Sequence, residues 1–253
     1  MKILTLNLHC FEEDTIELNQ KLIVDIIHQE DIDVVFFQEV SQNKDDSTVN
    51  GDVKEGNYVY VIRQELLRAG SEYDYYYKFG NLAFGEYEEG LAILSKTKLT
   101  NKKSFYISKT MDYFQWNTRI IVNANTIIED NIINLSSIHF GWSDGYEVFE
   151  DQVDMLLENL DNNDINIIAG DFNISPGSKE YEYIVKKGYI DLFYNNEKKY
   201  YNIPTHINDI DQKEGSSRID YVMSNNKFNV ISRKIIFDKE MVSDHYGVFI
   251  EIK

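Results

Sequence analysis

The sequence has 253 residues and a net charge of −18, from 25 lysines and arginines against 43 aspartates and glutamates. Nucleic-acid binders gain much of their affinity by neutralising phosphates with Lys and Arg. Here basic residues occur only in scattered pairs such as Lys102-Lys103, without a basic run. Although a local positive groove is still compatible with this composition, it argues against general DNA binding, and we expect no nucleic-acid partner.

Composition and cysteine content indicate one folded domain in a reducing compartment. Hydrophobic residues make up 43% of the chain, and no Gly-, Ser- or Pro-rich linker divides it, so we expect a single domain over residues 1–253. Cys10 is the only cysteine, which excludes an intrachain disulfide. The first apolar run breaks off too early for a signal peptide, and no run approaches the ~18 residues of a bilayer span. The expected location is cytoplasmic, with no membrane partner.

Hydrophobic periodicity predicts many strands and a few helices. A strand at 3–6 is followed by a helix that begins at Asp14 or Thr15, a strand at 34–37 and a helix at 58–67. Strands follow near 74–79, 90–94, 103–108, 116–125 and 131–138, then a helix near 146–160 and a strand at 165–169. After a turn at 170–173, a helix begins at Ser178, and strands follow near 218–223, 229–237 and 246–252. This order predicts an α/β fold, a four-layered sandwich of two packed mixed β-sheets flanked by helices.

Polar residues gather where the predicted apolar strands stop. Strand ends that share one edge of a sheet sandwich converge on one cleft, as ligand sites at strand ends often do. We therefore expect the following side chains to lie together: Asn7, Glu39, His139, Asp171, Asn173, Asp220, Asp244 and His245.

The sharpest of these signals is Gly170-Asp171-Phe172-Asn173, directly after Ile167-Ile168-Ala169. A carboxylate at the tip of a buried strand can activate water, and an amide two residues later can donate a hydrogen bond to a phosphoryl oxygen. The alternative is an ordinary turn, because Gly, Asp and Asn are turn residues.

The other strand-end residues have equally simple alternatives. His245 can stabilise a phosphorus centre with Asp220 fixing its tautomer, but Asp220 can also be a surface residue paired with Arg218 or Lys227. Glu39 can anchor Mg²⁺, which needs only one or two protein ligands, or it can be a solvated loop residue. A lone histidine such as His139 is more often structural than catalytic.

Together and in this order, these segments resemble the signature blocks of the endonuclease/exonuclease/phosphatase superfamily, from Asn7 to His245. The segments are Leu6-Asn7, Gln38-Glu39-Val40, Gly90-Leu91-Ala92-Ile93-Leu94-Ser95, Ile138-His139-Phe140, Gly170-Asp171-Phe172-Asn173, Arg218-Ile219-Asp220-Tyr221 and Ser243-Asp244-His245.

The resemblance implies a role for each matching residue. Glu39 is implied to be the principal Mg²⁺ ligand, with Mn²⁺ as an alternative ion, Asn7 beside it and Asp244 as a further carboxylate on the metal side. Asp171 is implied to activate water. Asn173, His139 and His245 are implied to bind phosphate, with Asp220 orienting His245 and either Glu88 or Glu89 supporting His139. The implied reaction is metal-dependent hydrolysis of a phosphate ester by in-line attack of water.

Several further stretches, among them Trp116-Asn117-Thr118-Arg119 and His139-Phe140-Gly141-Trp142, resemble the bacterial maltose 6'-phosphate phosphatases, which are cytoplasmic enzymes. This resemblance implies a phosphorylated disaccharide as the small-molecule substrate. Trp142 can stack on a sugar ring or simply pack its loop, and Arg119 can grip a phosphate or form a salt bridge at a strand end. The sequence departs from this family around residues 195–216, including Thr205-His206.

Three other functions compete with a sugar phosphatase. A nuclease is disfavoured by the charge of −18, and a sphingomyelinase by the lack of a signal peptide and of an apolar membrane hairpin. A binding module without activity is disfavoured by the intact set of implied catalytic residues.

Overall fold

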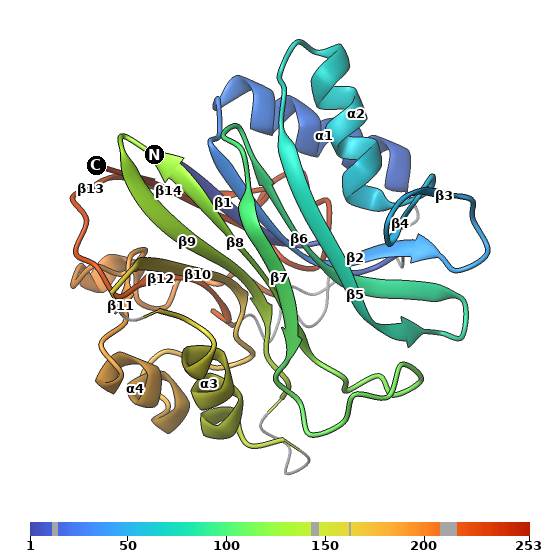
Figure 1. Cartoon of the computed structure of the whole chain (residues 1–253). Helices are drawn as coiled ribbons and strands as arrows, with labels where there is room; N and C mark the ends of the chain where they lie inside the picture. The colour runs from blue at the N-terminus through green and yellow to red at the C-terminus, as the bar shows by residue number, and fades with distance from the viewer. Residues whose placement is uncertain (12–14, 143–146, 162, 208–216) are drawn as a thin grey trace.

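Two six-stranded mixed sheets form the centre of the computed structural model, which describes residues 1–253 apart from 12–14, 143–146, 162 and 208–216 (Figure 1). The first sheet has the strand order β13-β14-β1-β2-β6-β5, in which only β1 and β2 are parallel among the described pairs. Its strands are β1 (Lys2–Asn7), β2 (Val34–Asn43), β5 (Asp74–Ala83), β6 (Tyr87–Ser95), β13 (Val230–Ile236) and β14 (Gly247–Ile252).

The second sheet repeats this plan, with the order β11-β12-β10-β9-β8-β7 and one parallel pair, β9 and β10, among the pairs described. Its strands are β7 (Thr100–Tyr106), β8 (Ile120–Ile128), β9 (Asn131–His139), β10 (Ile165–Asp171), β11 (Ile190–Asp191) and β12 (Asp220–Ser224). A separate small hairpin consists of β3 (Thr48–Asn50) and β4 (Val53–Lys54). Because parallel strands run in one direction, β1 with β2 and β9 with β10 each end at a common edge.

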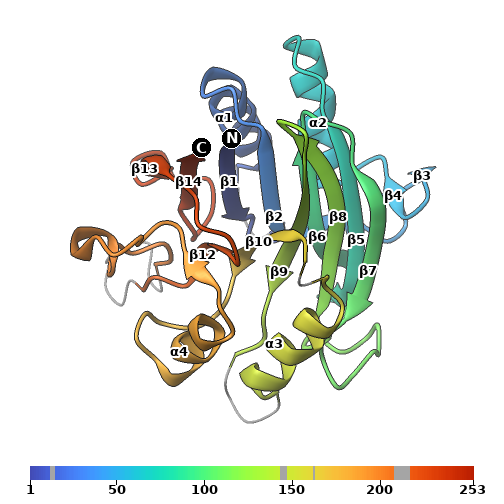
Figure 2. The same ribbon diagram turned by 60° about the vertical axis from the view of Figure 1, so that its left-hand side comes forward.

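Helices cover the outer face of each sheet (Figures 1 and 2). They are α1 (Ile16–Gln29) and α2 (Tyr58–Arg68) on the first sheet and α3 (Phe149–Glu158) and α4 (Lys179–Lys186) on the second. The short 3₁₀-helix η1 (Lys198–Tyr200) instead packs Tyr200 against the apolar layer between the sheets. Within β2, Phe37 packs toward the helices and Phe36 toward the second sheet, so both faces of this strand are buried. Three apolar layers result, and the predicted helix–sheet–sheet–helix sandwich is confirmed.

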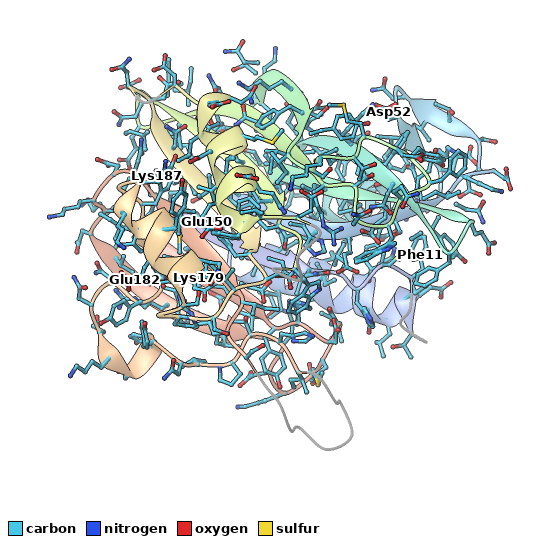
Figure 3. All side chains as sticks on the ribbon, turned by 90° about the horizontal axis from the view of Figure 1, so that it is seen from below. Phe11, Asp52, Glu150, Lys179, Glu182 and Lys187 are labelled. Atoms are coloured by element: carbon cyan, nitrogen blue, oxygen red, sulfur yellow. The ribbon has the colours of Figure 1, made fainter. Side chains whose placement is uncertain are left out.

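The helices are amphipathic, with charged residues on their outer faces. On α4, Tyr181 and Ile184 are buried against the second sheet, whereas Lys179 and Glu182 are exposed, as Figure 3 shows from below. The Ser178 hydroxyl accepts a hydrogen bond from the Tyr181 N–H and so caps the predicted helix start. Among the described residues, no helix is long and apolar enough to cross a membrane.

Several expectations about element boundaries were wrong, among them the strand expected near 116–125, which runs from Ile120 to Ile128. The strand expected at 34–37 continues to Asn43, because an irregularity between Phe37 and Val40 lets it resume pairing with β6. Asp171 is still part of β10 and does not lie in a turn. The short strands β3, β4 and β11 were not predicted, since two or three residues carry no periodicity. Of the expected helix limits, Asp14 and residue 146 lie outside the described residues.

Gly170 provides a test of how closely the two strands of the parallel pair approach. It has φ +148°, and a Cβ atom here would lie 2.0 Å from the Ile138 carbonyl oxygen. Gly188 is the control: it has φ +95° but open space around it, so a side chain there adds backbone strain without a steric clash. Gly188→Ala should lower the free energy of unfolding by about 1–2 kcal/mol, and Gly170→Ala should lower it clearly more. Equal losses in urea denaturation would show that the close approach adds nothing.

Candidate active site

Strand register brings the predicted site residues to one edge of the sandwich. In the parallel pairs, Asn7 of β1 lies opposite Gln38, and His139 of β9 lies opposite Asp171 of β10. On the other side of β10, Asp171 lies opposite Asp220 of β12. Asn7, His139, Asp171 and Asp220 therefore lie at strand ends, as the sequence predicted, and Gln38 lies inside β2 beside Asn7.

Asn7 connects the two sheets at this edge. Its side-chain Nδ2 donates to Glu39 Oε1 at 2.9 Å and to Asp171 Oδ2 at 3.2 Å. Its Oδ1 accepts from the backbone N–H of His9 at 3.0 Å, which fixes the direction of the buried amide. One amide thus uses both hydrogens on two carboxylates, one from each sheet.

Unusual backbone conformations direct two of these side chains. Glu39 has φ +51° within the irregular part of β2, and Asn173 has φ +52° directly after β10. Non-glycine residues with positive φ cost of order 1–3 kcal/mol and cluster at functional sites. The Asn173 N–H donates to Asp171 Oδ1 at 2.9 Å, so this turn also holds the Asp171 carboxylate.

Asp220 holds His245 in one orientation. Its Oδ2 lies 2.9 Å from His245 Nδ1, and both side chains are buried. Burial lowers the pKa of His245, but the Asp220, Asp171 and Asp244 carboxylates outweigh it and raise the pKa to about 10. The imidazole is therefore protonated at neutral pH, with Nε2 facing Asp171 Oδ2 at 3.7 Å.

His139 has the opposite electrostatic environment. Its Nε2 also lies 3.7 Å from Asp171 Oδ2, but burial and the charges of Arg119 and His245 hold its pKa well below the usual range. The site thus pairs a neutral imidazole with a protonated one on either side of the same carboxylate. Both distances are too long for direct hydrogen bonds, so neither Nε2 atom is hydrogen-bonded to Asp171.

The carboxylates of Glu39 and Asp171 are candidates to hold a divalent cation. Burial, with the neighbouring Glu89 charge, raises the pKa of Glu39, and burial with the Asp220 charge raises that of Asp171. Asn173 Nδ2 donates to the Phe140 carbonyl, whereas Asn173 Oδ1 is buried with no partner among the described residues. The atom that Asn173 leaves for a ligand is an oxygen, which differs from the donor role expected for it. Crowded carboxylates and a free amide oxygen are the hard donors that Mg²⁺ and Mn²⁺ prefer.

A cavity of about 390 Å³ opens beside these groups. It is lined by Glu39, Asn81, Leu82, Ala83, Phe84, Glu89, Trp116, Arg119, His139 and Trp142. Trp116 and Trp142 are 59% and 49% exposed, so neither residue is buried by packing against its own loop. Arg119 is buried, and within the described chain its Nε has no hydrogen-bond partner. The expected strand-end salt bridge of Arg119 is not among the described ion pairs, and Arg119 Nη1 donates to the Trp116 carbonyl at 3.5 Å beside the cavity that both residues line.

The structure decides which of Glu88 and Glu89 lies near His139. Glu88 accepts from Gln42 at 2.8 Å and pairs with Lys54 at 3.1 Å, away from the cavity. Glu89 shares the cavity wall with His139, as alternation along β6 requires of its neighbour. Glu89 is therefore the one of the two that is placed to support His139.

Three residues near the site had not been assigned a role. Gln38 Nε2 donates to Ser137 Oγ at 3.1 Å and its Oε1 accepts from Thr5, so it joins the sheets beneath the site. Thr205 Oγ1 accepts from the N–H groups of Ile219 and Asp220, each at 3.0 Å. His206 packs against His245, with ring centroids 4.6 Å apart. Gln38 could have been found from the sequence because it directly precedes Glu39. Thr205 and His206 could not, because they lie in the segment where the sequence departs from the family that it resembles.

Two mixed sheets between helices, with buried carboxylates and imidazoles at one edge, define a layered α/β protein whose site is suited to phosphate esters. The chain belongs to the Endonuclease/Exonuclease/phosphatase family, whose model matches residues 4–245. Members of this family are hydrolases that act on phosphoesters, and the family is generally dependent on divalent metals. The predicted superfamily is thereby confirmed.

Solved structures agree with this assignment. The chain is 26% identical to an endonuclease/exonuclease/phosphatase family protein from Leptotrichia buccalis, with a TM-score of 0.91 and coverage of 100% of this chain and 99% of that chain. A mannosyl-6-phosphatase from Bacteroides thetaiotaomicron is 18% identical, with a TM-score of 0.67 and coverage of 100% and 99%. The catalytic domain of human Nocturnin with bound sulfate is 17% identical, with a TM-score of 0.71 and coverage of 100% and 94%. No curated protein matches the sequence.

Asp171→Asn tests the centre of the site. The variant keeps the shape of the side chain, and its one amide oxygen can still accept from either Asn7 or Asn173, so folding and ligand binding should persist. Loss of the carboxylate should lower turnover of a phosphate ester by roughly 10²–10⁴-fold, the usual contribution of a general acid–base group. Steady-state kinetics on the folded variant give the answer, and near-native turnover would remove Asp171 from the reaction.

Proposed function

We propose that this protein is a metal-dependent phosphomonoesterase that removes the phosphate from a phosphorylated sugar, maltose 6'-phosphate or a similar disaccharide phosphate. The observation that carries the proposal is the cavity in which Trp116 and Trp142 share a wall with Glu39, Arg119 and His139. A phosphate at the carboxylate–imidazole centre leaves its organic group in this cavity.

Each residue around Asp171 has a different role in the proposed hydrolysis. His245, protonated and held by Asp220, donates to a phosphoryl oxygen, and the Arg119 guanidinium, whose Nε has no partner among the described residues, balances the charge of a phosphate monoester dianion. Asp171 accepts a proton from the attacking water, and its raised pKa makes it a better base than an exposed aspartate. Asn7 holds the Asp171 oxygen in place during this transfer.

Glu39 would hold Mg²⁺ or Mn²⁺, with Asn7 orienting its carboxylate and with Asp244 and the amide oxygen of Asn173 beside the site. The ion supplies positive charge that neutralises the ester and the developing charge of the transition state. Without such an ion, the phosphate meets a cluster of carboxylates that repels it.

The cavity suits a sugar because its wall combines flat apolar surface with polar groups. Indoles offer faces on which a sugar ring can stack, and Asn81 and Glu89 offer hydrogen-bonding groups for hydroxyls. The likeness to a mannosyl-6-phosphatase is in keeping with this choice, although at 18% identity it shows the fold alone. The negative charge of −18 favours a small substrate over nucleic acid, and we propose a cytoplasmic enzyme with no nucleic-acid or membrane partner.

A panel of phosphorylated substrates tests the proposal, with release of inorganic phosphate as the readout for monoesters and separation of the cleavage products as the readout for the lipid and the duplex. Disaccharide and monosaccharide phosphates, an aryl phosphate, an inositol phosphate, a sphingomyelin-like lipid and an abasic-site duplex are compared with Mg²⁺ and with EDTA. The expected result is metal-dependent turnover that is highest on a sugar phosphate. Full activity in EDTA would contradict the metal, and better turnover of the duplex or lipid would contradict the substrate.

Trp142→Ala should lower kcat/KM for the sugar phosphate and leave slow aryl-phosphate hydrolysis nearly unchanged. Stacking energy remote from phosphorus positions the ester for attack, so its loss affects rate as well as affinity. Phe114→Ala is the matched control, because Phe114 is 73% exposed near the same face but does not line the cavity. Equal losses on both substrates would mean that Trp142 only packs its loop.

A further inference from the structure

Histidines are concentrated around Asp244 beyond what the proposed reaction uses. The chain has five histidines, and His9, His206 and His245 all approach the Asp244 carboxylate. His206 and His9 lie 3.6 Å and 3.7 Å from Asp244 Oδ2 through their Nε2 atoms, and His245 Nε2 lies 3.9 Å from Oδ1. One carboxylate thus has three imidazoles at a spacing longer than a direct hydrogen bond.

Three of these groups form a compact set of ligand atoms. One atom each from His206, Asp244 and His245 lie within 4.8 Å of one another. Two donors about 2.0–2.2 Å from a tetrahedral zinc ion are roughly 3.3–3.6 Å apart. The gap between His206 and Asp244 is therefore close to the spacing that a shared ion imposes, with small side-chain movements closing the rest.

The backbone holds this set rigidly. An isolated β-bridge places His206 opposite His245, and the Ile207 N–H donates to the Asp244 carbonyl at 3.0 Å. Thr205 anchors the same segment to β12 through the Asp220 N–H. Such preorganisation distinguishes a built site from a chance meeting of side chains.

The two rings are also oriented as metal ligands are. His245 Nδ1 is engaged by Asp220, the carboxylate–histidine arrangement that accompanies metal-bound imidazoles and aims Nε2 at the ion. His206 Nδ1 is buried and has no partner in the described part of the chain. The polar contact of this ring is therefore the one that its Nε2 makes with Asp244.

We propose that His206, Asp244 and His245 form a second cation site that takes a divalent transition metal such as Zn²⁺ and regulates the enzyme by inhibiting it. Two imidazoles and one carboxylate suit zinc, whereas the oxygen donors around Glu39 suit Mg²⁺. Inhibition rests on the proposed function, because an ion that binds His245 Nε2 replaces the proton which this atom donates to the phosphoryl oxygen, and the proton is released to solvent. The donor atoms of this second site therefore select Zn²⁺ over Mg²⁺, and binding of Zn²⁺ lowers the activity of the enzyme.

Zinc titration of the full-length protein by calorimetry, with Mg²⁺ present, tests the site without any substrate. His206→Ala should weaken this binding by at least the roughly 10–100-fold that loss of an outer-shell partner costs. His206→Gln serves as a second variant of closer size, and His28→Ala is the control, since His28 lies on the surface beside Ser71 and should leave binding unchanged. Equal zinc affinity in the wild type and both His206 variants would overturn the proposal.

The activity measurement then tests regulation. Zinc should inhibit Mg²⁺-dependent hydrolysis by the wild type and by His28→Ala, while both His206 variants keep their basal activity and resist the inhibition. Activation by zinc, or inhibition that persists without His206, would overturn the regulatory role. If no phosphate ester is hydrolysed, the proposed function fails, and the calorimetric titration still decides whether the cation site exists.

Discussion

The amide of Asn7 is the contact on which the site depends. It places one hydrogen on Glu39 and the other on Asp171, and these carboxylates belong to different sheets. Asp171 is buried and Glu39 is half-buried, and carboxylates in such surroundings repel each other and lose hydration, so they stay together only where donors or cations compensate. Asn7 compensates in part, and the raised pKa values of both acids show that the compensation is incomplete. The site is thereby prepared for a divalent ion and for the phosphate that follows it.

Other contacts in the sandwich hold the strand ends that carry Asn7 and Asp171 close together. Gln38 and Ser137 join the sheets directly below it, and Gly170 allows the backbone of β10 to lie against β9. The irregularity in β2 turns Glu39 toward the centre at the cost of a positive φ. Strain of this kind persists only where surrounding structure determines it, which the buried strands on both sides supply.

The sequence was sufficient to predict the layers and the convergence of strand ends, because both follow from apolar periodicity and from where each apolar run stops. Asn7, His139, Asp171 and Asp220 could be placed in this way. The irregularity that turns Glu39, and the choice between Glu88 and Glu89, depend on local register, which periodicity does not fix. Trp116 and His206 reach the site from loops whose paths are set by tertiary contacts, so their proximity to His139 and His245 was not predictable.

Thermal unfolding of the wild type and of Glu39→Gln, in EDTA and in Mg²⁺, tests the central claim that the carboxylate cluster is built for a cation. Glutamine can still accept from Asn7 but removes a charge that repels Asp171 and Glu89. In EDTA the variant should be at least as stable as the wild type. Magnesium at about 100 times its dissociation constant should stabilise the wild type by about 2.7 kcal/mol and leave the variant nearly unaffected. A variant that is less stable in EDTA and gains as much from Mg²⁺ as the wild type would contradict the account.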